Sequence, residues 1–129
     1  MTSEPDHYAI GDCAEVSGLL CQHIAPIQKA AGALAKTLAG ERTAVHYPAM
    51  PVIVKTSFYP IIVCPWVGAT AEQPGTWQFE LDDDGSAKGI CHDPMGQPVG
   101  FLLSGKRVSE RFALEKQMPA WLAEVESES

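Results

Sequence analysis

The chain has 129 residues, of which 46% are hydrophobic and 19% are charged, and its net charge is −7. These values predict a globular protein that buries a core. The acidic charge disfavours nucleic acid and anionic membrane surfaces as partners, and no apolar run approaches the ~18–20 residues that span a bilayer. Because the polar N-terminus does not resemble a signal peptide, we expect a cytoplasmic protein.

Residues 1–46 are expected to contain a strand end, a loop and a helix. Tyr8-Ala9-Ile10 is a short apolar run closed by Gly11, which predicts a buried strand end, and Ser17-Gly18 marks a turn in the loop that follows. The helical segment has Pro26 in its first turn and Gly40 just past its end. Its apolar stripe has helical spacing and consists of Ile27, Ala30, Ala31, Leu34, Ala35 and Leu38. Such small residues predict close packing, and exposed apolar surface on this helix predicts self-association.

Residues 47–122 carry strand patterns. The β-branched segments 51–56 and 60–66 are bounded by prolines, and segments 76–81, 86–92 and 99–104 follow with short turns at 82–85 and 93–97 between them. The last three predict an antiparallel meander. A C-terminal helix is expected to begin with Ser104 as its N-cap and to end near Pro119.

The fold class is therefore α+β. The first part, residues 1–46, has too little strand to form a domain and looks like the tail of a larger α/β unit. Residues 47–122 form a small antiparallel sheet with a C-terminal helix, and residues 123–129 form an acidic tail.

Metal binding is not predicted. The four cysteines (Cys13, Cys21, Cys64 and Cys91) contain no C-x-x-C pair, so we expect reduced, mostly buried thiols. Cys91 and His92 are adjacent on a strand and point to opposite faces. The acidic run 82–84 lacks the later ligands of a calcium loop and is expected to be a solvated turn.

Gly11-Asp12 is the sharpest candidate site. A glycine at a strand end allows close approach to a ligand, and the aspartate can accept hydrogen bonds from ligand hydroxyls. The alternative is an aspartate in a turn or at a helix cap. The stretch "TSEPDHYAIGDCAE" resembles the second flavin-binding motif of FAD-dependent oxidoreductases related to the pyridine nucleotide-disulfide reductases. The resemblance implies that Gly11 and Asp12 contact the ribityl chain of FAD, and that the helix beginning at Ile24 lies under the flavin pyrimidine edge.

The resemblance extends along the chain. "ALAKTLAGERTAVHYPAMPVIVKT", "PIIVCP" and "GFLLSGKRVSERFALEKQMPAWL" are similar to the C-terminal portion of the NADH-dependent rubredoxin reductases, over residues 2–122. This implies that Lys55 lies at the flavin, that NADH or NADPH is the electron donor, and that the small domain docks rubredoxin or a similar iron–sulfur carrier. The alternative for Lys55 is an edge-strand lysine that reaches water.

No G-x-G-x-x-G motif occurs in the chain. We therefore expect the FAD- and NAD-binding domains to lie outside this segment, and the segment alone to be inactive. A cluster of cations, Lys106, Arg107, Arg111 and Lys116, is the candidate docking surface, because opposite charges speed encounter with an acidic carrier. The alternative is a solvated helix face. A second candidate function is a free-standing, non-enzymatic docking or oligomerisation module with vestigial flavin residues.

Overall fold

Two α-helices, one 3-10 helix and two antiparallel sheets make up the computed structural model, which describes residues 1–20 and 22–121. The α+β class is confirmed. The chain divides into two units, Met1–Pro48 and Ala49–Trp121, each with its own internal contacts. The predicted acidic tail, 123–129, and Cys21 lie outside the described residues.

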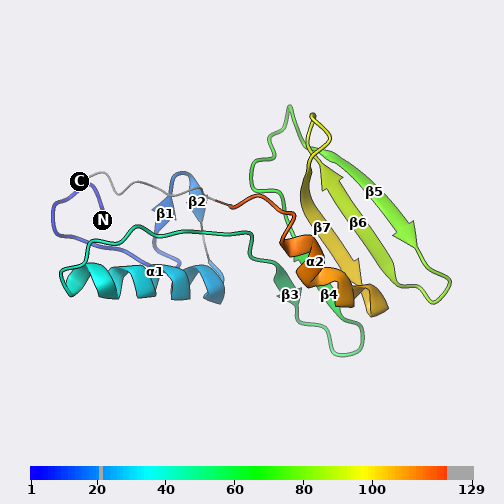
Figure 1. The fold of residues 1–129 in the computed structure, drawn as a ribbon, viewed down its shortest axis with the longest axis horizontal. Helices are drawn as coiled ribbons and strands as arrows, with labels where there is room; N and C mark the ends of the chain where they lie inside the picture. The colour runs from blue at the N-terminus through cyan, green and yellow to red at the C-terminus, as the bar shows by residue number, and fades with distance from the viewer. Residues whose placement is uncertain (21, 122–129) are drawn as a thin grey trace. The chain divides into compact units, whose positions relative to one another are not determined.

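A small hairpin opens the first unit (Figure 1). Strand β1 (Glu15–Val16) pairs with β2 (Leu19–Leu20). Ser17 and Gly18, which connect them, both have positive φ, at 50° and 81°, as the tightest hairpin turns require. The turn was predicted and the pairing was not. The expected strand at 8–10 is wrong: this segment is irregular and exposed in the structure, because a short apolar run forms a strand only beside a partner.

Helix α1 spans Ile24–Leu38, as the periodicity predicted, and Gly40 follows with φ +98°. Its buried residues are Pro26, Ala30 and Ala33. The predicted stripe is thus wrong by a rotation, because Ala31, Ala35 and Leu38 are exposed. Near the end of the helix, the Thr37 hydroxyl donates to the Ala33 carbonyl (3.0 Å) and accepts from the Thr43 amide (3.0 Å). These bonds hold the returning chain against the Ala33–Thr37 side.

The second unit is a five-stranded antiparallel sheet with strand order β3-β4-β7-β6-β5 (Figure 1). Strands β5, β6 and β7 form the predicted meander. Strands β3 and β4 form a second hairpin that joins the sheet along β7, so that the last strand lies between the two hairpins. The strands are β3 Val52–Val54, β4 Ile61–Cys64, β5 Thr76–Leu81, β6 Ala87–His92 and β7 Pro98–Ser104.

Two short helices follow β7 in place of the single predicted helix. A 3-10 helix, η1, spans Gly105–Glu110, and α2 spans Arg111–Glu115. Ser104 makes no capping bond; its hydroxyl instead accepts a hydrogen bond from the Ala87 amide at 3.1 Å. Gly105 has φ +61°, outside the helical region. Ser104 thus occupies the predicted N-cap position, but its side chain does not cap the helix, because its hydroxyl bonds to the sheet.

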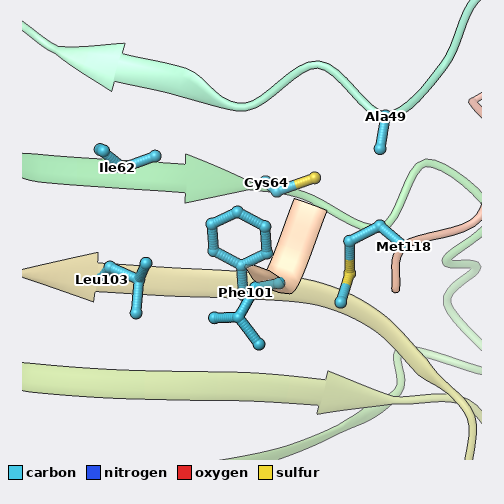
Figure 2. Packing of buried hydrophobic residues seen from close by; sticks show 7 residues of the cluster. Ala49, Ile62, Cys64, Phe101, Leu103 and Met118 are labelled. Carbon is cyan, nitrogen blue, oxygen red and sulfur yellow. The ribbon is translucent and has the colours of Figure 1, made fainter. Parts of the chain in front are cut away.

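The core of the second unit lies between the sheet and α2 (Figure 2). Phe101 and Leu103 of β7 are fully buried. Leu114 of α2 and Met118 beyond it pack in the same cluster. Full burial of a Phe or Leu side chain contributes about 1.5–3 kcal/mol, so β7 supplies much of the stability of this unit. The cluster also includes Ala49, Ile62 and Cys64.

Candidate functional site

Gly11 begins a tight turn beside the first turns of α1. Its φ is +87°, its carbonyl accepts from the Ala14 amide at 3.0 Å, and a Cβ on Gly11 would reach only the tip of Ile27, at 4.0 Å. Asp12 is exposed and has no hydrogen bond or ion pair with any residue that the structure describes. It therefore caps no helix there. The open backbone and the free carboxylate fit a ligand that offers hydroxyl groups.

Ile24, the first residue of α1, is 73% exposed. The preceding N-cap, His23, makes no side-chain capping bond, and the first turn contains no acidic residue. The amide groups of this turn and the positive end of the helix dipole thus suit an electron-rich acceptor. Gly11, Asp12 and Ile24 all belong to the first unit.

Lys55 belongs to the second unit and follows directly on β3. Its side chain is exposed, and it makes no ion pair with the described residues. The structure is thus compatible both with a lysine in water and with a lysine that contacts a cofactor.

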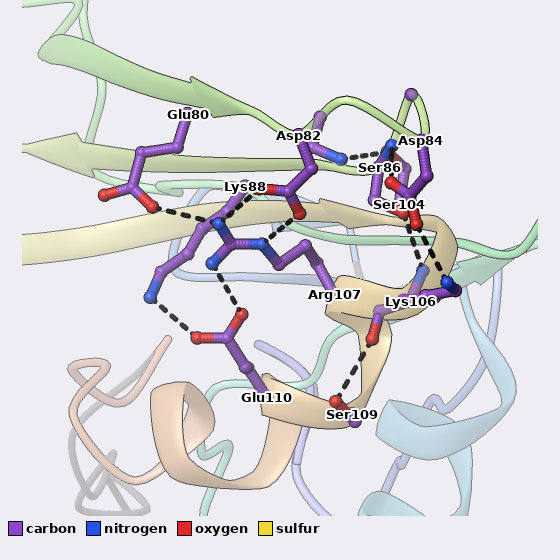
Figure 3. Close-up of polar contacts among 12 residues, drawn as sticks. Glu80, Asp82, Asp84, Ser86, Lys88, Ser104, Lys106, Arg107, Ser109 and Glu110 are labelled. Carbon is purple, nitrogen blue, oxygen red and sulfur yellow. Dashed lines mark hydrogen bonds and ion pairs between the residues drawn. The ribbon is translucent and has the colours of Figure 1, made fainter.

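Arg107 lies at the centre of an acidic network that joins the β5–β6 hairpin to η1 (Figure 3). Its guanidinium pairs with Asp82 through Nε (2.6 Å) and with Glu110 through Nη1 (3.2 Å), and Glu80 lies 3.4 Å from Nη2. Glu110 also accepts from Lys88 at 2.8 Å. The Arg107 charge is therefore balanced within the domain, although the sequence placed it on a docking surface.

The other cations of the predicted docking cluster have different surroundings. Lys106 is exposed and lies 3.3 Å from a carboxylate oxygen of Asp84. The Arg111 guanidinium stacks on the ring of Phe112, with 4.7 Å between its Cζ and the ring centroid. Lys116 is exposed and makes no ion pair within the described part of the chain. The four cations thus do not form one free positive patch.

Two of the three carboxylates in the acidic turn 82–84 make hydrogen bonds within the domain. Hydrogen bonds from Arg107 lower the pKa of Asp82. Bonds from the amide and hydroxyl of Ser86 lower the pKa of Asp84, and the bond from Lys88, followed by that from Arg107, lowers the pKa of Glu110. The turn is thus solvent-accessible, as expected, and two of its aspartates, Asp82 and Asp84, are also paired with Arg107 and Lys106.

Tyr59 was missed by sequence reasoning. Its hydroxyl donates to the Gly85 carbonyl at 2.6 Å and lies 3.4 Å from the Ser104 hydroxyl. It thereby connects loop 55–60, turn 82–86 and the segment 104–107, which we call together the Tyr59 end of the sheet. The partner of Tyr59 is a backbone carbonyl 26 positions away, so no side-chain pattern could have revealed it.

Two negative findings apply to the described residues only. No group of three or more histidine, cysteine or acidic side chains lies close enough to hold a metal ion. Neither helix combines the length and hydrophobicity needed to cross a membrane.

The fold and the site define a small α+β module whose sheet is preceded by a segment with a ligand-compatible turn and helix start. The family described as the rubredoxin binding C-terminal domain matches residues 44–118, which is more than half of the chain. The chain belongs to this family.

Known relatives extend the match toward the N-terminus. The chain is 40% identical over 119 residues to rubredoxin-NAD(+) reductase of Alcanivorax borkumensis, covering 92% of this chain and 30% of the relative. It is 46% identical over 120 residues to the rubredoxin-NAD(+) reductase of Acinetobacter baylyi, covering 92% and 29%. It is 41% identical over 119 residues to the nitric oxide reductase FlRd-NAD(+) reductase of an Enterobacter species, covering 92% and 30%. The chain thus spans about 30% of the length of these oxidoreductases.

Proposed function

We propose that this chain is the acceptor-docking part of a flavoprotein reductase that passes electrons from NADH or NADPH through FAD to rubredoxin or a similar small iron–sulfur carrier. The observation that carries the proposal is the family match over residues 44–118, which coincides with the unit Ala49–Trp121. The names of the relatives are consistent with this direction of electron flow. The FAD- and NAD-binding domains would come from sequence outside this segment, in the cytoplasm.

Part of the flavin site would lie in this chain. Asp12 would accept hydrogen bonds from the ribityl hydroxyls of FAD, with Gly11 allowing close approach, and the helix start at Ile24 would face the pyrimidine edge. Lys55 would contact the flavin as well. The support is local: a free carboxylate at Asp12, an open cradle at Gly11 and an N-terminal turn of α1 without a side-chain cap. FAD supplies hydride acceptance and single-electron release when it is bound.

The flavin proposal is tested by flavin absorbance after purification, with and without added FAD. Because the site is partial, we expect the chain to bind FAD weakly, to retain less than one FAD per chain and to lack reductase activity. Asp12→Ala should reduce any residual FAD binding, while Glu15→Ala, an exposed acidic control nearby, should not. A chain that purifies with one FAD per molecule would contradict the partial site.

The docking proposal includes Lys106, Arg107, Arg111 and Lys116. Lys106 and Lys116 extend into solvent, whereas Arg107 would act mainly by holding η1 in place. The test is calorimetric titration of the chain with oxidised rubredoxin at low and high salt. We expect affinity to fall as salt rises, because exposed charges are screened. If the affinity for rubredoxin is the same at low and high salt, these cations have no role in docking.

A free-standing docking or oligomerisation module is the second candidate. The observations that favour it are the separate core of the second unit and the exposed apolar side of α1 at Ala31, Ala35 and Leu38. In that case the flavin residues would be vestigial. Sedimentation of the chain over a range of concentrations tests self-association. The module is favoured if the chain binds rubredoxin and if substitutions of Asp12 or Lys55 do not change its affinity for flavin.

A further inference from the structure

We propose that the Tyr59 end of the sheet is the surface that docks the electron carrier, with the Phe58 ring as its apolar anchor. The occupant to which we commit is a small redox protein of the rubredoxin type that offers an apolar recess to the ring. This inference rests on the proposed function and deepens it, because it assigns docking to one particular end of the domain.

Strand register brings three distant segments to this end. In the last row of the sheet, Val54 pairs with Ile61, Ile61 with Ser104, Ser104 with Ala87 and Ala87 with Leu81. Loop 55–60, turn 82–86 and the start of η1 therefore leave the sheet on the same side, the lower end in Figure 1. Two of the sequence-predicted site residues, Lys55 and Lys106, thereby belong to segments at one end of the sheet, although 51 positions separate them.

Phe58 projects from this end. Its side chain is 99% exposed, more than any other large hydrophobic residue among those described. A single exposed hydrophobic residue is common on protein surfaces, so exposure alone assigns no role. What distinguishes Phe58 is the set of hydrogen bonds made by the loop that carries it.

Hydrogen bonds hold loop 55–60 on both sides of Phe58. The Thr56 hydroxyl donates to the Tyr59 carbonyl, which closes the loop beneath Phe58. The Tyr59 hydroxyl donates to Gly85 at 2.6 Å, and the Gly105 amide donates to the Pro60 carbonyl at 3.0 Å. Phe58 is thus presented by a preorganised loop, which lowers the entropic cost of binding. Aromatic residues presented in this way dominate many protein interfaces.

Charges of both signs lie around Phe58, because turn 82–86 at this end carries three aspartates, of which Asp82 and Asp84 are paired and Asp83 is exposed. Lys106 is 87% exposed and only loosely paired with Asp84, at 3.3 Å, and the proposed flavin site does not use it. Arg107 is paired with Asp82 and Glu110 and is therefore not a free cation at this end. If Lys55 contacts the flavin, a carrier that docks at this end is also held close to the electron source, as efficient transfer requires.

The experiment compares Phe58→Ala with a matched control, Met95→Ala. Met95 is 86% exposed and lies in the β6–β7 turn, at the opposite end of the sheet. Oxidised rubredoxin is titrated calorimetrically into the full chain and into each variant, and far-UV circular dichroism checks that all three are folded. We expect Phe58→Ala to weaken binding about 10-fold or more, and Met95→Ala to change it less than about 2-fold.

The outcomes separate the two proposals. If the unsubstituted chain does not bind rubredoxin, the proposed function fails, and this inference fails with it. If the chain binds rubredoxin and the two variants bind equally well, the proposed function stands and the Tyr59 end is excluded. A second measurement replaces Phe58 or Met95 with a photo-crosslinking phenylalanine analogue: rubredoxin should crosslink at position 58 and not at position 95, and the reverse pattern would overturn the assignment.

Discussion

Arg107 and Asp82 form a two-point ion pair, with Nε 2.6 Å from Oδ2 and Nη2 2.7 Å from Oδ1. This geometry matches the planar fork of the guanidinium to the carboxylate and is stronger than a single contact. The pair connects the end of β5 to η1, and Glu110 closes the network from the helix side. A cation that the sequence assigns to a partner is therefore used to join two elements of the same domain.

The Arg107 network predicts a pH-dependent stability. The pKa values of Asp82 and Glu110 are lowered in the folded state, so their stabilisation is fully present above the unfolded-state values of about 3.9 and 4.3. It is lost as pH falls through the lower folded-state values. We expect the thermal midpoint to fall as pH is lowered from about 5 to 3. Differential scanning calorimetry across this pH series provides the measurement.

Arg107→Met should lower the thermal midpoint at neutral pH and make its fall in acid shallower, since the carboxylates then lose their partner. Lys116→Met is the control, because Lys116 is exposed and makes no ion pair with the described residues. If Arg107→Met and the unsubstituted chain show equally steep acid dependence, the network does not stabilise the fold.

Gly105 should tolerate no side chain. A Cβ at this position would lie 2.4 Å from the Ser86 hydroxyl oxygen and 2.8 Å from the Tyr59 hydroxyl oxygen, and φ is +61°. Gly96 has φ +80° with no atom near its Cβ position, so Gly96→Ala should cost only the backbone term, about 1–2 kcal/mol. Gly105→Ala should cost more, by the free energy needed to displace the two hydroxyl groups. Urea unfolding measures both, and equal losses would show that the Tyr59 contacts are weak.

Leu103 and Leu102 offer a test of the core. Leu103 is fully buried against α2, whereas its neighbour Leu102 points to the other face and is half-buried. Leu103→Ala should reduce the free energy of unfolding by about 2–5 kcal/mol, and Leu102→Ala by about 1 kcal/mol. Guanidinium unfolding followed by circular dichroism would decide, and similar losses at the two positions would contradict the placement of the core on the helix-covered face.

Thiol reactivity should follow burial. Burial raises the pKa of Cys64 to about 11 and also raises the pKa of Cys91, and both side chains are almost fully buried. Because the thiolate is the reactive form, iodoacetamide at mildly alkaline pH should modify the exposed Cys13 well before either buried cysteine. Peptide mass spectrometry identifies the modified residues, and urea should abolish the protection. Rapid modification of Cys64 in the folded chain would contradict its burial.

Local patterns predicted most of the elements. Proline and glycine boundaries located α1, and strand patterns separated by short turns located β5, β6 and β7. The pairing of β4 with β7 could not be predicted, because it joins Ile61–Cys64 to residues about 40 positions later, and many registers satisfy two apolar segments. Periodicity likewise could not show which side of α1 the rest of the unit covers, and the side that is buried holds Pro26, Ala30 and Ala33.

The sequence could predict which residues belong to the candidate site, but not which contacts they make. Asp12 and Lys55 were found through motif resemblance, and their free side chains leave both predictions open to test. The sequence could not show which cations of the docking cluster are free, because it does not reveal that Arg107 pairs with Asp82 and Glu110. No sequence pattern indicated the role of Tyr59, because its partner is a main-chain carbonyl.

The central place of β7 in the sheet predicts when the second unit can fold during its synthesis. The hairpins β3–β4 and β5–β6 emerge from the ribosome first, yet they share no hydrogen-bonded edge until β7 is available to both. Isolated hairpins are marginal in water, so the nascent sheet gains its stability only when residues 98–104 have left the exit tunnel. Until then the apolar faces of both hairpins are open to chaperones and to neighbouring chains. A translational pause before β7 would therefore be expected to lower the yield of folded protein more than a pause after it.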